Sequence, residues 1–432
     1  MSNFKPTSNI SSQPLMLHKI EHFLNKHHLA VLCSVVVAGL VLSISRRPDL
    51  VFHPQFWAED GRYWYAQAYN HGFHSLLYSY GGYLVMFYHL VALISLVLPF
   101  RLAPLFFNLT ALVIQLTPLL LINSNRLRKI IPYRSLAIVV SFLYISIPNA
   151  TEVFGNLTNV QWHLGVTAFL ILIAESSMSW KWYAFDVFIL LVIGLSGPLV
   201  IMLLPITLLL CLHKHSNEHR RNAVLLAVLA LVQLLYIFVF NHLNRAGGQS
   251  DVNLLYLVKM VVGQIFTGAL LGEKHVAMYY NHPLVLMLLL VIGLSLILYA
   301  VLRGPLWLKL FNLYSLLIFA ATLLLKPASG SNAWQTLTDP SADQRYWYIP
   351  MIVWLSTLLW LLFAARIKLL RVVAGIIMAL LITIGIPGSW HIPPLPRLHF
   401  QTYAKNFQAV KPRTRYTIPI NPVGWEMTLT KH

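Results

Sequence analysis

The feature that most constrains this chain is a series of apolar runs, each separated from the next by a short polar loop. A helix needs about 20 apolar residues to cross the hydrocarbon core of a bilayer, and fewer where other helices surround it. The composition, 58% hydrophobic and only 10% charged residues, excludes an ordinary soluble domain. We therefore expect an all-α polytopic membrane bundle over residues 1–388 and a polar tail over 389–432. About eleven transmembrane helices are expected, at roughly 28–45, 103–123, 135–149, 160–176, 183–196, 198–213, 222–241, 283–302, 310–326, 347–365 and 372–388.

The basic residues indicate how this bundle is oriented. A net charge of +18 would favour a nucleic-acid partner in a soluble protein, but here the charges lie in clusters between apolar runs, so we expect membrane lipids as partners and no nucleic acid. With the N-terminus in the cytoplasm, these residues fall inside: Arg126, Arg128, Lys129, Arg134, Lys181, Lys214, Arg220, Arg221, Arg303, Lys309, Arg366, Lys368 and Arg371. The acidic residues then fall outside: Asp49, Glu59, Asp60, Glu152, Asp251, Glu273, Asp339, Asp343 and Glu426. The active face and the C-terminal tail are therefore predicted to be extracytoplasmic.

Three stretches need separate treatment. The run from Gly82 to Pro99 is predicted to be an interfacial helix, since counting it as a span would invert the later basic loops, and 254–271 is interpreted as a second interfacial helix. Gly194–Pro198 interrupts the 183–213 region, which predicts two short helices that meet in a polar turn. The first apolar run begins near Ala30 and is interpreted as a span rather than a cleavable signal. The functional outer loops are expected at 46–102, 149–160, 242–282 and 327–346.

The first outer loop carries two adjacent carboxylates in the sequence Trp57-Ala58-Glu59-Asp60-Gly61. A carboxylate in such a loop is suited to act as a general base or to bind a hard cation. The alternative is structural, because acidic residues in a first helical turn complement the helix dipole. Both interpretations remain open on these residues alone.

Short motifs along the chain carry a resemblance, and they are Trp57–Gly61, Gly82-Tyr83, Asn159–Trp162, Ser196–Pro198 and Arg345-Tyr346. Together they resemble the GT-C superfamily of membrane glycosyltransferases, and in particular bacterial multi-pass proteins of that type. The resemblance implies a polyprenyl-phosphate sugar donor, a glycan, lipid or protein acceptor, and inverting transfer on the outer side of the bacterial inner membrane. It requires no metal, although an acidic loop could recruit Mg²⁺ or Mn²⁺. The order here is Glu59-Asp60 where the family often has Asp-Glu, so either residue could be the base.

Other loops supply candidate binding residues. Glu152, Asn159, Gln161 and Trp162 in the second outer loop, with Trp57 and Tyr83 in the first, suit a sugar or acceptor, because amides bind hydroxyls and aromatic rings pack on the C–H face of a sugar. The alternative is that Asn159 caps the next helix and Trp162 anchors at the membrane interface. The resemblance makes Arg345 the first candidate for the donor phosphate, with Arg62 and Lys274 as further candidates. A lone Arg at a span end can instead snorkel to the interface.

Several function classes lack their motifs. The chain has no Gly-x-x-x-x-Gly-Lys-Ser/Thr loop, no His-Glu-x-x-His and no Gly-x-Ser-x-Gly, and no metal site is predicted. The main alternative is a transporter or flippase of a lipid-linked saccharide that acts without catalysis. Neither an inverted repeat nor a mid-span proton relay supports it. A third possibility, an acyltransferase, is disfavoured because the outer histidines are scattered.

Overall fold

A computed structural model describes residues 15–176, 179–214, 216–240, 253–325 and 333–432. Within this part the chain is helical apart from two short antiparallel hairpins. Eight of the described helices are long and apolar enough to cross a membrane, which indicates a polytopic integral membrane protein as the apolar runs predict. They are His28–Arg46, Phe100–Ile122, Asn217–Val239, Leu254–Leu271, Pro283–Arg303, Leu306–Leu324, Gln344–Ala364 and Lys368–Ser389.

The elements follow in this order along the chain. The first part contains α1 (Leu15–Lys26), α2 (His28–Arg46), α3 (Asp49–Phe52), α4 (Ala66–His71), β1 (Ser79–Tyr80), β2 (Tyr83–Leu84), α5 (Met86–Ser95), α6 (Ala103–Gln115), α7 (Thr117–Ile122), α8 (Arg134–Ile145), α9 (Val160–Ile173), α10 (Trp180–Gly194), α11 (Leu199–Lys214) and α12 (Asn217–Leu235). The second part contains α13 (Leu254–Val258), α14 (Gly268–Leu271), α15 (Glu273–Tyr279), α16 (Pro283–Arg303), α17 (Leu306–Leu325), α18 (Ala333–Leu337), α19 (Tyr348–Ala364), α20 (Lys368–Leu380), α21 (Ile386–Ser389), α22 (Phe400–Gln408), β3 (Arg415–Ile420) and β4 (Trp425–Thr430). Short 3₁₀ or π-helical segments continue or join these helices at Asp60–Tyr65, Gly72–Leu77, Phe100–Leu102, Asn125–Leu127, Tyr236–Phe240, Lys259–Thr267, Gln344–Trp347 and Leu381–Gly385.

Four of the expected spans form helices that are shorter than a bilayer requires. They are α8, α9, α10 and α11, with 12, 14, 15 and 16 residues. At 1.5 Å per residue, such helices reach only about 18–24 Å, against about 30 Å of hydrocarbon. The polar turn expected between α10 and α11 is confirmed, because α10 ends at Gly194, α11 begins at Leu199, and Gly197 between them has φ of +147°.

The stretch 254–271 differs from the prediction of an interfacial helix. It folds as one continuous helical segment, Leu254–Leu271, whose length and apolar character place it among the candidate spans. Its one charged residue, Lys259, is half-buried, and its ammonium lies 4.6 Å from the centre of the Tyr280 ring. By contrast, the Gly82–Pro99 region contains the ten-residue helix α5, which is too short to cross alone, as expected.

Helix α9 is the centre of the bundle. Twelve of its fourteen residues are buried, and it packs against α6, α7, α10, α11 and α19. A helix that is apolar on all sides belongs in a protein interior, which explains why α9 needs no lipid-facing length. Its N-terminal end, at Gln161 and Trp162, is thereby fixed relative to the loops that surround it.

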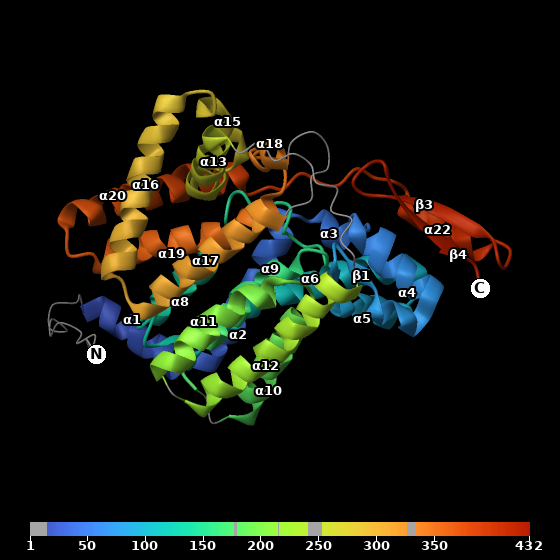
Figure 1. Cartoon of the computed structure of the whole chain (residues 1–432), viewed down its shortest axis with the longest axis horizontal. Helices are drawn as coiled ribbons and strands as arrows, with labels where there is room; N and C mark the ends of the chain where they lie inside the picture. The colour runs from blue at the N-terminus through green and yellow to red at the C-terminus, as the bar shows by residue number, and fades with distance from the viewer. Residues whose placement is uncertain (1–14, 177–178, 215, 241–252, 326–332) are drawn as a thin grey trace.

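The C-terminal tail folds onto the first loop. Helix α22 and the hairpin β3–β4 lie at one end of the molecule beside α4, while α1 lies at the other end (Figure 1). In the hairpin, the alternate residues Ile418, Ile420, Met427 and Leu429 are buried, and their neighbours face outward. The amide of Asn70 on α4 holds β4 through hydrogen bonds to the Thr428 carbonyl at 3.0 Å and from the Thr430 N–H at 2.8 Å.

Candidate functional site

The Asp60 carboxylate joins the first predicted outer loop to the second. Its Oδ2 accepts a hydrogen bond from the Leu157 N–H at 3.0 Å. Its Oδ1 accepts from both the N–H and the hydroxyl of Thr158, each at 2.7 Å. Asp60 is only 1% exposed, so these bonds are shielded from water and hold residues 157–158 firmly against the first loop.

The electrostatic environment of Asp60 is strongly perturbed. Burial raises the pKa of the Asp60 carboxyl from 3.8 to about 7, and the adjacent Glu59 acts in the same direction. The three donors from Leu157 and Thr158 lower this pKa, but burial outweighs them. A carboxyl with these contacts is a positioning group whose charge depends on pH near neutrality.

Glu59 has a different environment from its neighbour. Its Oε1 accepts a hydrogen bond from the Tyr80 hydroxyl at 3.0 Å, and within the described part of the chain Tyr80 is its one hydrogen-bond donor. Tyr80 lies on the hairpin β1–β2, and Tyr83 faces it across the turn. Glu59 therefore keeps more of its acceptor capacity for another molecule than Asp60 does.

Glu152 and Arg345 connect the second predicted loop to the last one. The Glu152 Oε1 lies 3.2 Å from Arg345 Nη1, and its Oε2 accepts from the Arg345 backbone N–H at 3.0 Å. Burial raises the pKa of the Glu152 carboxyl, the Arg345 guanidinium lowers it, and the Glu59 charge raises it further. The Glu152–Arg345 pair joins the second loop to the last, and the Asp60 hydrogen bonds to Leu157 and Thr158 join the first loop to the second.

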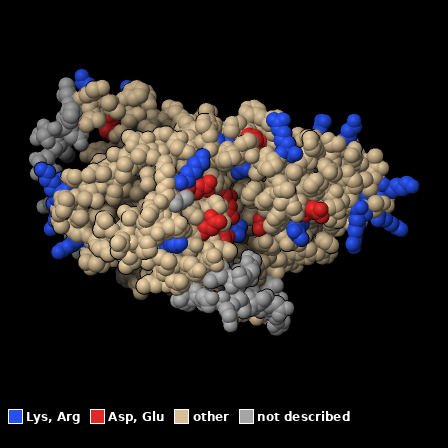
Figure 2. All heavy atoms as spheres, turned by 90° about the horizontal axis from the view of Figure 1, so that it is seen from above, with Lys and Arg blue, Asp and Glu red and all other residues tan. Residues whose placement is uncertain are grey.

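Gln344 fixes the same contact from the other side. Its side-chain oxygen accepts from the Thr151 hydroxyl at 2.7 Å and from the Glu152 N–H at 3.2 Å. Its amide nitrogen donates to Glu273 Oε2 at 3.1 Å, which brings the start of α15 into the cluster. Asp and Glu side chains gather near the middle of this face of the molecule (Figure 2).

The N-terminal end of α9 adds amide and aromatic groups. A Cβ built on Gly197 would lie 2.6 Å from Gln161 Oε1 and 3.5 Å from the Tyr83 ring, so these three residues are close neighbours. Trp162 is 5% exposed and packs edge-to-face on Tyr346 with ring centres 5.7 Å apart, which excludes its role as an interface anchor. Among the described residues, Gln161 Oε1 and Trp162 Nε1 are buried without a hydrogen-bond partner. Such atoms are available to a polar ligand.

Other candidate residues lie away from this cluster or serve the fold. Arg62 is exposed and lies 5.3 Å from the centre of the Trp425 ring, and Lys274 is exposed on α15. The Asn159 amide nitrogen donates to the Glu152 carbonyl and to Asn156 Oδ1, each at 2.9 Å, so it braces the second loop. Trp57 is half-buried and pairs with Asn421 of the tail. Parts of the expected loops, at 242–252 and 327–332 and including Asp251, lie outside the described residues.

Arg46 is a positioning residue that the sequence analysis missed. It is 1% exposed and donates to the carbonyls of Ile145, Ile147, Ser389 and Trp390, so it joins the end of α2 to the second loop and to the start of the tail. Its signal was present in the sequence, because an Arg at the predicted outer end of a first span departs from the positive-inside pattern.

The described residues contain no cluster of three or more His, Cys, Asp or Glu that could hold a metal ion. Comparisons with protein-family models, with curated proteins and with solved structures find no match to this chain.

Proposed function

We propose that this chain is a GT-C-type membrane glycosyltransferase, which moves a sugar from a polyprenyl-phosphate donor to a glycan, lipid or protein acceptor on the extracytoplasmic side. The observation that carries the proposal is a set of contacts between three separate loops beside the start of α9. Glu152 pairs with Arg345 across the second and last loops, and Asp60, next to Glu59, bonds Leu157 and Thr158 of the second loop. A carboxylate, a cation and unpartnered amide and indole groups in one place match the demands of sugar transfer from a phosphate.

Glu59 is the proposed general base. It is 7% exposed, and Tyr80 orients one of its oxygens while its partner acid, Asp60, is occupied by Leu157 and Thr158. This division of roles supports Glu59 over Asp60, because a base must be free to accept a proton and Asp60 already accepts three hydrogen bonds.

Arg345 is the proposed partner of the donor phosphate. Glu152 holds its backbone N–H and one terminal nitrogen, while the guanidinium side chain remains 27% exposed. Asp343 Oδ1 lies 3.6 Å from the other terminal nitrogen, so two carboxylates orient the guanidinium, and its exposed part can face phosphate oxygens. Preorganisation of this kind contributes most where charge develops, here on the leaving phosphate.

The proposed step is a single inverting displacement. The acceptor hydroxyl oxygen forms a bond to the anomeric carbon as the bond from that carbon to the phosphate oxygen breaks. The hydroxyl proton passes to Glu59, the bonding electrons leave with the polyprenyl phosphate, and Arg345 faces the negative charge of that phosphate. Gln161 and Trp162 would contact the sugar through their unpartnered polar atoms. The lipid tail of the donor remains in the bilayer throughout, and the step needs no nucleotide.

The test is mass spectrometry of envelope glycans from cells that lack this gene, complemented with wild type, Glu59→Gln or Glu175→Gln. Glu175 is a matched control because it follows the opposite end of α9 and its carboxylate pairs with Lys129. We expect a sugar to be lost on deletion and restored by wild type and Glu175→Gln but not by Glu59→Gln. Full restoration by a normally inserted Glu59→Gln would contradict transfer by this base and favour a non-catalytic transporter of a lipid-linked saccharide.

A further inference from the structure

A polar pocket lies between the first loop and the C-terminal hairpin. It has a volume of about 480 Å³, which is within the range of small-ligand sites. Its walls come from the helical segment Asp60–Tyr65, from α4 and from β4 with the turn before it. The lining residues are Arg62, Tyr63, Ala66, Gln67, Asn70, Gly424, Glu426 and Thr428.

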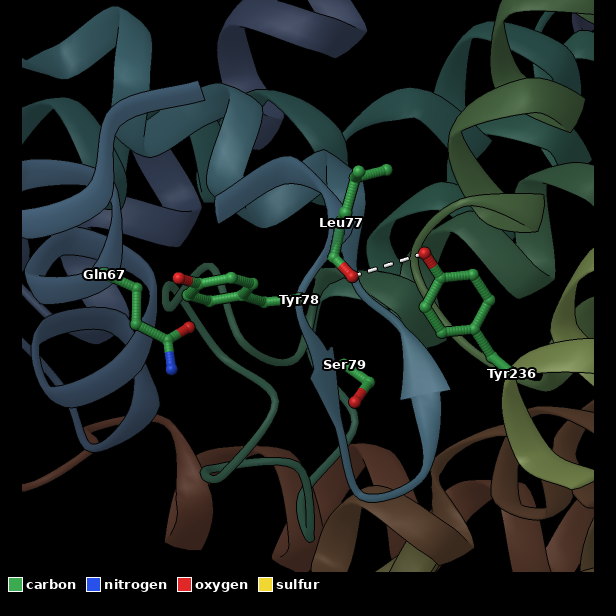
Figure 3. Close-up of a pocket in the computed structure, with 5 residues that line it drawn as sticks. All are labelled: Gln67, Leu77, Tyr78, Ser79 and Tyr236. Carbon is green, nitrogen blue, oxygen red and sulfur yellow. Dashed lines mark hydrogen bonds between the residues drawn. The ribbon is translucent and has the colours of Figure 1, made fainter. Parts of the chain in front are cut away.

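A second pocket of about 360 Å³ adjoins the first. Both pockets have Gln67 in their walls, and the second continues along the residues before and in β1. Figure 3 shows Gln67 on one side, the Tyr78 ring beside it, and Tyr236 on the far side with its hydroxyl bonded to the Leu77 carbonyl at 3.2 Å. We call the two pockets together the hairpin trough.

The hairpin trough approaches the proposed base. Ser79 lines the trough, and the next residue, Tyr80, donates its hydroxyl to Glu59. From the other pocket, the Tyr63 ring contacts the Tyr80 ring with centres 4.7 Å apart. A chain bound along the trough would therefore have one part beside Tyr80 and Glu59.

The lining has the chemistry that recognises a hydroxyl-rich chain. The Gln67 and Asn70 amides and the Thr428 hydroxyl offer donors and acceptors, and Tyr63 and Tyr78 offer aromatic faces. On the outward face of the hairpin, Arg415 pairs with Thr430 and Thr417 with Thr428, so one more cation and two hydroxyls continue the same polar surface.

The charge of this end of the molecule favours an acidic ligand. Residues 389–432 contain six Lys or Arg and one acid, Glu426. Basic side chains project from the tail end in Figure 2. Five of the six are exposed, and they are Arg397, Lys405, Lys411, Arg413 and Arg415. Such a field attracts anions, and Arg62 inside the trough can bind a carboxylate with two parallel hydrogen bonds.

A lipid surface fits this end less well than a saccharide. A segment that lies on a membrane presents several large apolar side chains to it. In the described tail, Val423 is the one large hydrophobic residue that is strongly exposed. The tail therefore presents positive charge without an apolar face, which favours a polar ligand there, and Leu77 in the trough wall is the exposed large apolar side chain of the lining.

We propose that the hairpin trough binds an acidic saccharide chain, the acceptor of the transfer reaction, with Arg62 contacting its carboxylates. The identification of this saccharide as the acceptor rests on the proposed function, but binding of the saccharide does not require catalysis. It gives Arg62 a role separate from that of Arg345, on the acceptor side of Glu59.

The test measures binding to the full chain in lipid nanodiscs. The probes are oligogalacturonate, an acidic saccharide, and maltooligosaccharide, a neutral one of similar length. Arg62→Gln and Thr428→Val remove polar groups of the trough, and Lys405→Gln is the matched control, because Lys405 is an exposed cation of the same tail that does not line the trough. Melting temperatures of all variants establish that they fold.

We expect oligogalacturonate to bind, Arg62→Gln to weaken it about tenfold or more, and Lys405→Gln to change it less than about twofold. Maltooligosaccharide should bind at least about tenfold more weakly than the acidic probe, because it lacks the partner of Arg62. The proposal is overturned if wild type binds neither probe, if anionic vesicles compete for the site, or if Arg62→Gln and Lys405→Gln weaken binding equally.

The two proposals can fail separately. Glu59→Gln should bind oligogalacturonate as wild type does, since Glu59 does not line the trough. If Arg62→Gln weakens oligogalacturonate binding while Glu59→Gln still restores the envelope sugar, the transfer proposal fails and the proposal of saccharide binding in the trough stands. If Glu59→Gln abolishes transfer but Arg62→Gln leaves saccharide binding unchanged, the trough fails and the transfer proposal remains.

Discussion

Glu152 holds Arg345 at two points, with one carboxylate oxygen 3.2 Å from the guanidinium and the other bonded to the backbone N–H at 3.0 Å. The Glu152 backbone N–H is in turn bonded by Gln344, the residue before Arg345. Each of the two loops therefore uses a side chain to bind the backbone of the other. An arginine fixed in this way has few orientations left, which is what binding of a phosphate requires.

Glu152→Gln should loosen Arg345 without removing it. Because a displacement of about 1 Å in a positioning group can cost on the order of a hundredfold in rate, we expect kcat/KM for the lipid-phosphate donor to fall about ten- to hundredfold. The measurement is transfer kinetics with a labelled donor, with Arg345→Gln beside it. If Arg345→Gln is inactive and Glu152→Gln is fully active, Arg345 acts without support from this pair.

Asp60→Asn should destabilise the fold. An amide can accept from Thr158 through its oxygen, but its nitrogen cannot accept from the Leu157 N–H, so one buried donor loses its partner. We expect the free energy of unfolding to fall by about 1–3 kcal/mol, as measured by denaturant titration. Glu59→Gln is the control, since its amide oxygen can still accept from Tyr80, and it should lose less than about 1 kcal/mol.

Stability should depend on pH through Asp60. The pKa of this carboxyl in the folded state is raised from 3.8 to about 7, so the folded state binds a proton that the unfolded state has released. This contribution is fully present below the ordinary pKa and is lost as the pH rises through about 7. As the pH rises from 3.8 to about 7, the melting temperature of the wild type should decline, and that of Asp60→Asn should decline less steeply. Equal slopes in the two proteins would assign the effect to other groups.

Gly197→Ala tests the contact between the α10–α11 turn and Gln161. The new Cβ would lie 2.6 Å from Gln161 Oε1, and φ of +147° is unfavourable for alanine. Gly72→Ala is the control, because Gly72 has φ of +57° but no atom within 4 Å of its added Cβ. Both variants should lose stability through their positive φ, by about 1–3 kcal/mol, with the larger loss in Gly197→Ala because of the contact with Gln161. Only Gly197→Ala should reduce transfer strongly. Equal activity in the two would separate Gln161 from the site.

Arg126 and Asp186 form a buried ion pair with two hydrogen bonds of 2.7 and 2.8 Å. Asp186→Asn leaves the buried arginine with only Glu218, 3.5 Å from its Nη2, as an acidic partner, and we expect a loss of about 1–3 kcal/mol in the free energy of unfolding. The double variant Arg126→Met with Asp186→Leu should recover much of that loss, because neither buried charge remains. Heat denaturation of the three proteins provides the comparison, and a double variant as unstable as Asp186→Asn would contradict this account.

The sequence predicted the helices better than their contacts. Apolar periodicity located every expected span on a helix, but α9 is short and central, which only packing against its neighbours decides. The sequence predicts Arg126 as one of the basic loop residues that orient the bundle, whereas it lies buried against Asp186. A charge in a loop does not reveal a partner 60 positions away. The stretch 254–271 is predicted to be interfacial, whereas it folds as one helical segment whose length and apolar character place it among the candidate spans.

The candidate site was predicted as a set of residues rather than as an arrangement. Glu59, Asp60, Glu152 and Arg345 were identified from their chemistry, yet the difference between Glu59 and Asp60 depends on Thr158, which carries no signal in the sequence. Arg62 and Arg345 are both candidate phosphate ligands by their chemistry, but in the structure the Arg62 guanidinium lies 5.3 Å from the centre of the Trp425 ring. Asp60 and Arg62 are close in the sequence, but their side chains face different sides, because residues 60–65 form a helical turn.

The contacts between the tail and the first loop have a consequence for biosynthesis. The Asp49 carboxylate accepts from the Leu395 N–H across 346 positions of sequence, and Asn421 bonds the backbone on both sides of Trp57. The loop that carries the acidic pair leaves the ribosome well before the segment that fixes its backbone, since Leu395 follows Asp49 by 346 positions. Every nascent chain thus passes through the translocon with an unfinished site. Chains whose translation stops before residue 395, or that are cleaved before it, would insert their helices and still lack the backbone geometry that orients Glu59.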